Sequence, residues 1–404
     1  MQRETTDILI AGGGIAGLTA AAAFGAAGFG VICIDPAPPV TDAFSPDADL
    51  RTTAVLQPAR DLLIRAGLWD HLSAHATPLA VMRIVDAGGK TLVTRDFVAA
   101  DIAPDRIGDP FGWNLPNRLL RRGLLARLAE LPRVSFRPGT GFAGLLAREK
   151  AALVTLTDGS RISARLLIGA DGRASAVRTA AGIGVRTRRY GQKALSFAVT
   201  HAAPHGNVST EVHRSGGPFT LVPLPDLDGV PCSSVVWMEH GTEVERLAAL
   251  PPDAFAAAAT ERAAHLYGPL TLASRRQIWP IISQIADRMA AGRVALIAEA
   301  AHVLPPIGAQ GLNMSLADLA CLLTLAAASP ATLGDTPMLD TYTRRRHPAA
   351  MLRVAGIAGL NLASMAGLPL LQALRGLGLR ALHDIAPLRR EVMKLGLGAI
   401  TPGR

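Results

Sequence analysis

The stretch Asp7-Ile-Leu-Ile-Ala-Gly-Gly-Gly-Ile-Ala-Gly-Leu18 leads from an apolar strand through a glycine-rich turn into a helix of small residues. Its Gly12-x-Gly14-x-x-Gly17 spacing in this context predicts a dinucleotide-binding turn. Gly12 permits the tight turn, Gly14 lets the backbone approach a pyrophosphate, and Gly17 lets the helix pack closely on the strand. We therefore expect a nucleotide cofactor near the N-terminus.

Two further features of this region favour the same cofactor. The start of the helix, including Ile15 and Ala16, supplies backbone N–H groups and a positive dipole end to the phosphates. Asp35 follows a second apolar strand, where a carboxylate accepts hydrogen bonds from an adenosine ribose and repels a 2′-phosphate. The tightly bound nucleotide is therefore predicted to be FAD or NAD rather than NADP.

The composition predicts a globular chain of two or three domains, because 404 residues with 49% hydrophobic side chains can bury a large core. Cys33, Cys232 and Cys321 lie far apart, with no Cys-x-x-Cys or Cys/His grouping. Neither a disulfide framework nor a zinc site is expected. The N-terminus lacks a signal-type apolar run after a basic region, so we expect a cytoplasmic protein.

The net charge of +9 alone would admit nucleic-acid binding, but only 4% of the residues are aromatic, so a stacking surface is not supported. Basic residues flank the uncharged run Val354–Leu374, which is long enough to span a membrane. The breaker Gly367-Leu368-Pro369 favours two short helices instead. A packed helical region, peripheral contact with the inner face of the membrane, and a true span all remain open. The arginines concerned are Arg344, Arg345, Arg346, Arg353, Arg375, Arg380, Arg389 and Arg390.

Short alternating runs between Ala194 and Met238 predict an antiparallel sheet inserted into the nucleotide-binding domain. Helices are predicted at Ala54–Ala66, Leu119–Leu131 and Asn313–Ala328, hairpins at Val81–Phe97 and Leu153–Gly169, and a buried parallel strand at Arg293–Ile297. The fold class is therefore α/β, with residues 1–75, 98–180 and 275–340 in a discontinuous nucleotide-binding domain. Residues 76–97 and 181–274 would form the substrate sheet, and residues 341–404 a C-terminal helical region.

Two more motifs join the glycine turn. Gly169-Ala-Asp171-Gly172-Arg-Ala-Ser175-Ala-Val-Arg178 places a carboxylate after an apolar strand, where it either binds a ribose hydroxyl or an arginine or simply forms a turn. Ala298-Glu299-Ala-Ala-His302-Val-Leu-Pro305-Pro306-Ile-Gly308-Ala-Gln310-Gly311-Leu312-Asn313 places a flexible turn before a helix. Backbone N–H groups there can stabilise negative charge on a bound group.

The three motifs together resemble those of the single-component flavoprotein monooxygenases, the group that includes para-hydroxybenzoate hydroxylase, over residues 7 to about 320. The third motif and the basic, apolar C-terminal region most resemble the ubiquinone-biosynthesis hydroxylases. The resemblance implies a glutathione-reductase-like FAD domain. With a single glycine fingerprint, NAD(P)H is expected to bind only transiently.

The resemblance also implies roles for individual residues. The backbone of Gly311, Leu312 and Asn313 would face the flavin pyrimidine, and Pro306 would stiffen the wall beside the isoalloxazine; Pro306 and Gly311 are the catalytic candidates. Arg51 and Arg118 match positions whose guanidinium groups approach the FAD phosphates, a task that suits arginine. Either could instead be a surface residue.

One departure from the family pattern concerns the carboxylate that holds the ribityl chain, because the usual Gly-Asp is here Ala298-Glu299. Glu299 is therefore a cofactor candidate whose side chain is one methylene longer. Glu299 and His302 also spell Glu-x-x-His, a di-iron pattern that would require a second copy. The sequence contains no second copy, so we expect no metal.

The reaction implied by the resemblance is aromatic hydroxylation, with O₂ as co-substrate, through a flavin C4a-hydroperoxide and with a polyprenylated phenol as substrate. Partners would include other ubiquinone-biosynthesis proteins. One alternative is a hydroxylase of a small soluble aromatic acid, with Tyr190 or Arg214 binding its carboxylate. Another is a flavin-bearing assembly subunit with little turnover. The sheet histidines His201, His205, His213 and His240 are weak candidates for a catalytic base.

Overall fold

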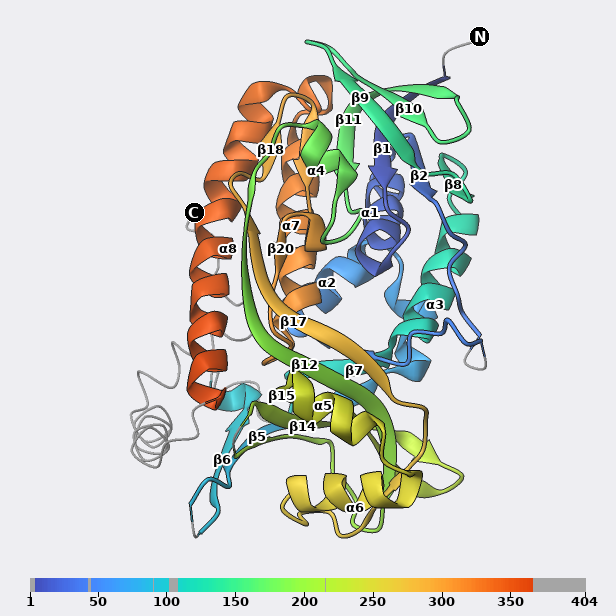
Figure 1. The fold of residues 1–404 in the computed structure, drawn as a ribbon. Coiled ribbons are helices and arrows are strands. Elements are labelled where there is room, and N and C mark those ends of the chain that lie inside the picture. The colour runs from blue at the N-terminus through green and yellow to red at the C-terminus, as the bar shows by residue number, and fades with distance from the viewer. Residues whose placement is uncertain (1–3, 43–44, 90, 102–107, 215, 366–404) are drawn as a thin grey trace.

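The computed structural model describes residues 4–42, 45–89, 91–101, 108–214 and 216–365. Two large sheets divide these residues into two halves, and the long helix α8 (Thr336–Met365) runs along the side of both (Figure 1). The predicted fold class is confirmed: the chain is α/β, with a largely antiparallel sheet inserted into a Rossmann-like half.

In the first half, the described residues form an eight-stranded sheet, whose strands β19, β11, β1, β2 and β8 are parallel and adjacent in this order. The strands β10 and β9 extend antiparallel from β11. Ile8, Leu9 and Ile10 are fully buried, as expected for a parallel sheet covered on both faces. The bounds are β1 (Glu4–Ala11), β2 (Val31–Asp35), β8 (Val134–Pro138), β9 (Phe142–Ala147), β10 (Ala152–Leu156), β11 (Arg161–Gly169), β18 (Ala290–Ala291) and β19 (Val294–Leu296).

In the second half, the described residues form a nine-stranded sheet in the order β20-β17-β12-β15-β14-β13-β5-β6, with β16 beside β12. One face packs Leu195 and Trp237 against Phe255 of α6 (Pro252–Arg262). On the other face, Ala194 and Met238 pack against Ile307, which belongs to the third motif. The bounds are β5 (Val81–Asp86), β6 (Val93–Val98), β12 (Val185–His201), β13 (Val208–His213), β14 (Pro218–Leu227), β15 (Val230–His240), β16 (Leu270–Leu272), β17 (Gln277–Ala286) and β20 (His302–Val303).

A small sheet and the remaining helices connect the two halves. The helix predicted at Ala54–Ala66 begins later, because residues 54–56 belong to a strand that pairs with β7, and tertiary pairing overrides local helix preference. The helix predicted from Asn313 begins earlier, at Gln310. The bounds are β3 (Thr52–Leu56), β4 (Thr77–Leu79), β7 (Gly112–Pro116), α1 (Ile15–Ala26), α2 (Gln57–Arg65), α3 (Asn117–Ala129), α4 (Ala176–Ala180), α5 (Gly241–Ala248) and α7 (Gln310–Ala328).

Two predicted domain boundaries do not match the elements. The boundary at residue 275 assigned β17 to the nucleotide-binding half, but β17 pairs along β12 and belongs to the nine-stranded sheet. The boundary at residue 341 falls inside α8, which continues through Pro348 to Met365. The first part of the uncharged run is thus the end of one long helix. The break expected at residues 367–369 lies outside the described residues.

Candidate functional site

The three motifs meet at one edge of the eight-stranded sheet. Ala11 pairs with Gly169, and Gly169 pairs with Leu296, so β1, β11 and β19 end side by side. The glycine turn, the Asp171 motif and the Glu299 motif each follow one of these carboxyl ends. In open α/β sheets, ligands bind outside the carboxyl ends of the strands. The sequence motifs therefore define one site in space.

The glycine turn has the shape that a pyrophosphate site needs. Gly12 has a φ of +115°, and a Cβ atom there would overlap the backbone of Ala170. A Cβ atom at Gly17 would overlap the carbonyl oxygen of Gly12, so α1 packs tightly on the turn. At Gly14 a Cβ atom would meet none of the described atoms within 4 Å. The turn thus packs closely against Ala170 and α1, whereas its side at Gly14 is open.

The N-terminus of α1 faces the same space. Its first helical bond runs from the Leu18 N–H to the Gly14 carbonyl oxygen. The N–H groups of Ile15 and Ala16 therefore precede the hydrogen-bonded turns of the helix, and Gly14 provides no side-chain cap. Such amides suit an anionic ligand.

Asp35 ends β2, and its carboxylate accepts two backbone hydrogen bonds. Its Oδ2 accepts from the Gly13 N–H at 2.6 Å, and its Oδ1 accepts from the Ala37 N–H at 2.9 Å. These bonds hold the glycine turn against the end of β2. Contact between Asp35 and an adenosine ribose stays a prediction.

Asp171 organises the second motif internally. Its Oδ1 accepts from Ser175 Oγ at 2.5 Å, and its Oδ2 accepts from the Val177 N–H at 3.0 Å, which caps α4. Arg178 then donates from Nη1 to the Ala300 carbonyl oxygen at 2.9 Å. The second motif is thereby tied to the third. The Asp171 carboxylate forms hydrogen bonds within its own turn, and its contact with a ribose hydroxyl stays a prediction.

The two arginines predicted to approach FAD phosphates differ in their surroundings. Arg51 forms a two-point pair with Asp49, at 2.8 and 2.9 Å, and its guanidinium lies 4.0 Å from the centre of the Trp279 ring. Burial disfavours the charged form of Asp49, but the bonds from Arg51 outweigh it and hold the pKa of Asp49 below its usual range. Arg118, in α3, has no hydrogen bond or ion pair to any residue within the described ranges. A phosphate ligand would suit Arg118 as placed, whereas Arg51 already has an anionic partner.

The third motif carries strained backbone where the family pattern has glycine. Ala298 has a φ of +56°, a conformation that costs free energy for any residue with a Cβ atom. The next residue, Glu299, has a side chain 48% exposed, and its Oε2 lies 3.4 Å from Arg173 Nε. Burial opposes the charge of Arg51, but the bond and charge of Asp49, with a smaller contribution from Glu299, raise the pKa of Arg51. Glu299 stays a proposed ribityl contact.

The start of α7 presents the backbone predicted to face the flavin. Gly308 and Ala309 both have positive φ, at 62° and 57°, which turns the chain sharply into the helix. Pro306 and Gly311 are exposed, and a Cβ atom at Gly311 would have no described neighbour within 4 Å. The amides of the first turn, including Leu312, therefore open onto unfilled space at a positive helix end.

The side chain of Asn313 has a role that the sequence did not predict. Its Oδ1 accepts from the Leu56 N–H at 2.9 Å, and its Nδ2 donates to the Ala54 carbonyl oxygen at 2.7 Å. The side chain thus joins the first turn of α7 to the end of β3. The sequence shows only that residue 313 is an asparagine, and that signal does not reveal the contact with β3.

A buried charged network lies behind α7. His302 Nε2 lies 2.5 Å from Asp318 Oδ2, and Arg346 Nε donates to Asp318 Oδ1 at 2.7 Å. The Asp318 side chain is 0% exposed. Burial disfavours the charge of Arg346, but Asp318 outweighs it and raises the pKa of Arg346. The network joins the third motif, α7 and α8.

This network also separates the two residues of the Glu-x-x-His pattern. Glu299 pairs with Arg173 and His302 with Asp318. Within the described part of the chain, no group of three His, Cys, Asp or Glu side chains could hold a metal ion. Glu299 and His302 thus have separate partners in the structure.

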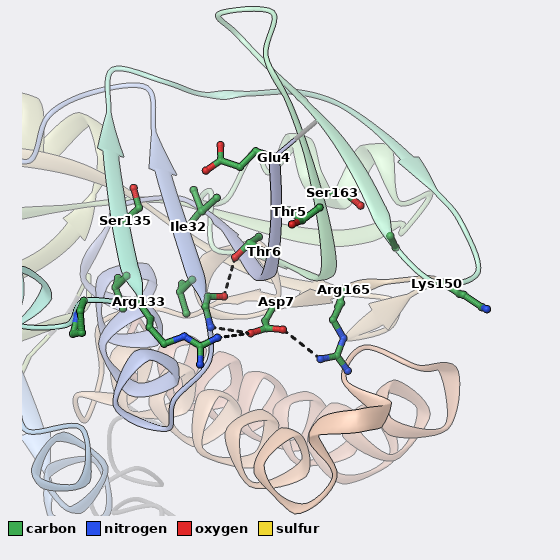
Figure 2. A pocket seen from close by; sticks show the side chains of 15 residues that line it. Glu4, Thr5, Thr6, Asp7, Ile32, Arg133, Ser135, Lys150, Ser163 and Arg165 are labelled. Atoms are coloured by element: carbon green, nitrogen blue, oxygen red, sulfur yellow. Dashed lines mark hydrogen bonds and ion pairs between the residues drawn. The ribbon is translucent and has the colours of Figure 1, made fainter. Parts of the chain in front are cut away.

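A shallow depression of about 680 Å³ lies at the opposite edge of the same sheet. Figure 2 shows Asp7 between Arg133 and Arg165. Asp7 Oδ2 lies 3.6 Å from Arg133 Nη2, and Asp7 Oδ1 lies 3.3 Å from Arg165 Nη1. The depression adjoins the amino ends of β1 and β2, away from the three motifs. Its central carboxylate already has two cationic partners, so it is not the candidate site.

Comparison with known proteins agrees with this geometry. Residues 5–356 match the family described as "FAD binding domain". The chain therefore belongs to this FAD-binding family, and it is an FAD-dependent monooxygenase.

Several relatives match over almost their whole length. A ubiquinone hydroxylase, UbiL, from Rhodospirillum rubrum is 33% identical over 403 residues, covering 99% of this chain and 91% of the relative. The 3-demethoxyubiquinol 3-hydroxylase of Escherichia coli is 26% identical over 402 residues, covering 98% and 100%. Among solved structures, p-nitrophenol 4-monooxygenase PnpA from Pseudomonas putida superposes with a TM-score of 0.78 at 21% identity, covering 97% of this chain and 99% of that one. The structural similarity to PnpA supports the fold of this chain.

Proposed function

We propose that this protein hydroxylates the aromatic ring of a polyprenylated phenol in ubiquinone biosynthesis. The observation that carries the proposal is the meeting of three FAD motifs beside an inward-facing sheet surface. Both relatives described above have names that refer to hydroxylation of ubiquinone or its precursors.

The described residues fit FAD. The open turn at Gly14 and the amides of α1 would hold its pyrophosphate, and Arg118, which has no competing partner among the described residues, would bind a phosphate. The amides of Gly311 and Leu312 would hold the flavin ring at the start of α7, and Pro306 would form the adjoining wall. When bound, FAD supplies O₂ activation. The surrounding residues bind the substrate and exclude water.

The sheet surface beside this site supports an apolar substrate. Met238, Ile281, Ile307 and Ile357 form one buried apolar cluster between the sheet, the third motif and α8. Each buried methylene of a prenyl chain contributes about 0.8 kcal/mol. The alternative, a soluble aromatic acid bound by Arg214, is less well supported, because Arg214 pairs with Glu261 of α6 at 3.0 Å.

We further propose that NAD(P)H binds transiently, since the sequence has a single glycine fingerprint, and that other proteins of ubiquinone biosynthesis are partners.

Turnover distinguishes this enzyme from a flavin-bearing assembly subunit. With a prenylated phenol, NAD(P)H and ¹⁸O₂, the FAD-loaded protein should form a product with one labelled oxygen. Label from water instead, or a bound flavin with no product, would contradict the proposal.

Among the described residues, two helices, α7 and α8, are long and apolar enough to cross a membrane by length and composition. The buried Asp318 network makes α7 a core helix. The C-terminal part of α8 has an apolar outer face, with Leu352 64% and Leu360 53% exposed, and the exposed Arg344 and Arg345 lie earlier in the same helix. We propose a cytoplasmic protein that contacts the inner face of the membrane peripherally through α8.

Flotation with anionic vesicles tests the membrane contact. Binding should fall as salt rises, because exposed charges are screened over about 8 Å at physiological ionic strength. Extraction by detergent alone would indicate insertion, and an absence of binding would restrict α8 to packing on the protein.

A further inference from the structure

Glu211 and His213 form a shielded pair on β13. They are two residues apart in a strand, so both lie on one face, while Val212 between them points into the opposite core with Phe255. His213 Nε2 lies 2.7 Å from Glu211 Oε1. Their side chains are only 12% and 13% exposed. The pair is therefore held in a fixed geometry away from bulk water.

The bond to Glu211 determines which ring nitrogen carries the proton. An ionised carboxylate only accepts hydrogen bonds, so Nε2 of the neutral ring donates to it. Nδ1 is then left as an acceptor. In the structure, Nδ1 of His213 is buried and has no hydrogen-bond partner among the described residues. A buried acceptor of this kind lacks its ligand or a water molecule.

The strand register places this acceptor on the face that adjoins the flavin-binding motif. Glu211 pairs with Thr220, Thr220 with Val236, and Val236 with Ser196, in one row across four strands. Val236 packs on the cluster that contains Ile307 of the third motif. Val236 of this row therefore lies beside the third motif, and Glu211 lies on the same face two strands, or roughly 10 Å, away from Val236.

Two more polar atoms of this row are orphaned. Ser196 Oγ and Thr220 Oγ1 are buried and have no partner within the described chain. Ser196 itself is only 2% exposed. They lie on strands two apart, roughly 10 Å from each other, with Val236 between them in the row. Unsatisfied buried hydroxyl groups are costly unless a ligand binds them.

We propose that His213, oriented by Glu211, is the catalytic base that takes the proton from the ring hydroxyl of the phenolic substrate. The proposal rests on the proposed function and adds a residue to it. The O–H bond breaks, an Nδ1–H bond forms, and the electron pair stays on the substrate oxygen. Glu211 stabilises the resulting imidazolium. The phenolate ring is richer in electrons and therefore more reactive toward an electrophilic oxygen, and the proton returns to that oxygen in the product.

Two other charged side chains share this face. Asp86 of β5 pairs in register with His213, and its Oδ1 also accepts from the Gly88 N–H at 2.9 Å. Arg95 of β6 lies in the row of Glu211, beyond Ile84. Because the charges of Asp86 and Arg95 also affect ionisation of a bound phenol, the variants are compared at one fixed pH.

The test uses 4-nitro-2-prenylphenol, whose phenolate absorbs visible light, added to FAD-loaded enzyme buffered below the solution pKa of the probe. Wild type should bind the probe as phenolate. His213→Gln should lower the affinity for the phenolate about tenfold or more, and Glu211→Gln, which keeps the shape and removes the charge, should lower it in the same direction. The control His240→Gln changes an exposed histidine at the end of β15 and should behave as wild type.

Two results would overturn the proposal: wild type that leaves the probe neutral or unbound, or His213→Gln that ionises it as well as wild type does. The flavin spectrum, recorded in the same samples, separates this failure from failure of the proposed function. Loss of FAD from wild type, or no labelled product, contradicts the enzyme assignment. Intact flavin without ionisation contradicts only the role of His213.

Discussion

Replacing Arg346 by methionine would remove the guanidinium next to Asp318 while keeping most of the side-chain volume. Asp318 is 0% exposed, so its carboxylate would be left with His302 as its sole ion-pair partner in the described structure. Two unit charges about 4 Å apart interact by about 4 kcal/mol at an effective dielectric constant near 20. Breaking a buried pair by removing one partner costs about 3–5 kcal/mol. We therefore expect Arg346→Met to lower the free energy of unfolding by about 3–4 kcal/mol.

Urea unfolding of the FAD-loaded protein measures this loss. Arg344→Met is the matched control, since Arg344 is exposed on the same helix and, among the described residues, donates a hydrogen bond only to Thr341 Oγ1, at 2.9 Å. The control should change stability by at most about 0.5 kcal/mol. Asp318→Asn combined with Arg346→Met should recover part of the loss, because no buried charge is left without a partner. If Arg346→Met and Arg344→Met unfold at the same urea concentration, the network does not stabilise the fold.

Three further substitutions test the cofactor site. Gly17→Ala should weaken FAD retention severely, because the added Cβ atom would overlap the backbone of the glycine turn. The control Gly311→Ala places its Cβ atom in open space and should still fold. Equal FAD content and stability in Gly17→Ala and wild type would refute the close packing. Asn313→Ala should cost about 1–3 kcal/mol in thermal unfolding by leaving buried backbone groups unsatisfied, and an unchanged midpoint would contradict that role. Ala298→Gly should be neutral or stabilising, since it relieves a positive φ, while Ala300→Gly should destabilise by about 0.5–1 kcal/mol; the reverse order would exclude strain at residue 298.

The cofactor motifs were predictable because their function is local. The glycine turn, the Asp171 motif and the turn before α7 each combine strand, turn and helix signals within a short stretch. Their meeting at one sheet edge followed from the rule that parallel strands end together. The hairpins at β5–β6 and β10–β11 were equally local, and both predictions are confirmed.

The errors came from pairings between distant segments. Residues 54–56 form a strand because β7 pairs with them, and β17 leaves the nucleotide-binding half because β12 extends far enough to bind it. The pair of Arg51 and Asp49 is a local feature with a two-residue spacing, and a contact between Arg51 and an FAD phosphate stays a prediction. The face occupied by His213 depends on strand register, which a single sequence does not specify.

The position of β19 has a consequence for how the protein folds. β19 pairs with β11, yet residues 170–293, including most of the nine-stranded sheet, lie between them in the chain. During synthesis, β1, β2 and β11 emerge long before their last parallel neighbour, so the edge of β11 at Leu167–Gly169 stays unpaired until β12 to β17 have been made. Contacts so distant in sequence form slowly, and exposed edges aggregate. The sheet of the nucleotide half is therefore completed only after most strands of the inserted sheet have left the ribosome.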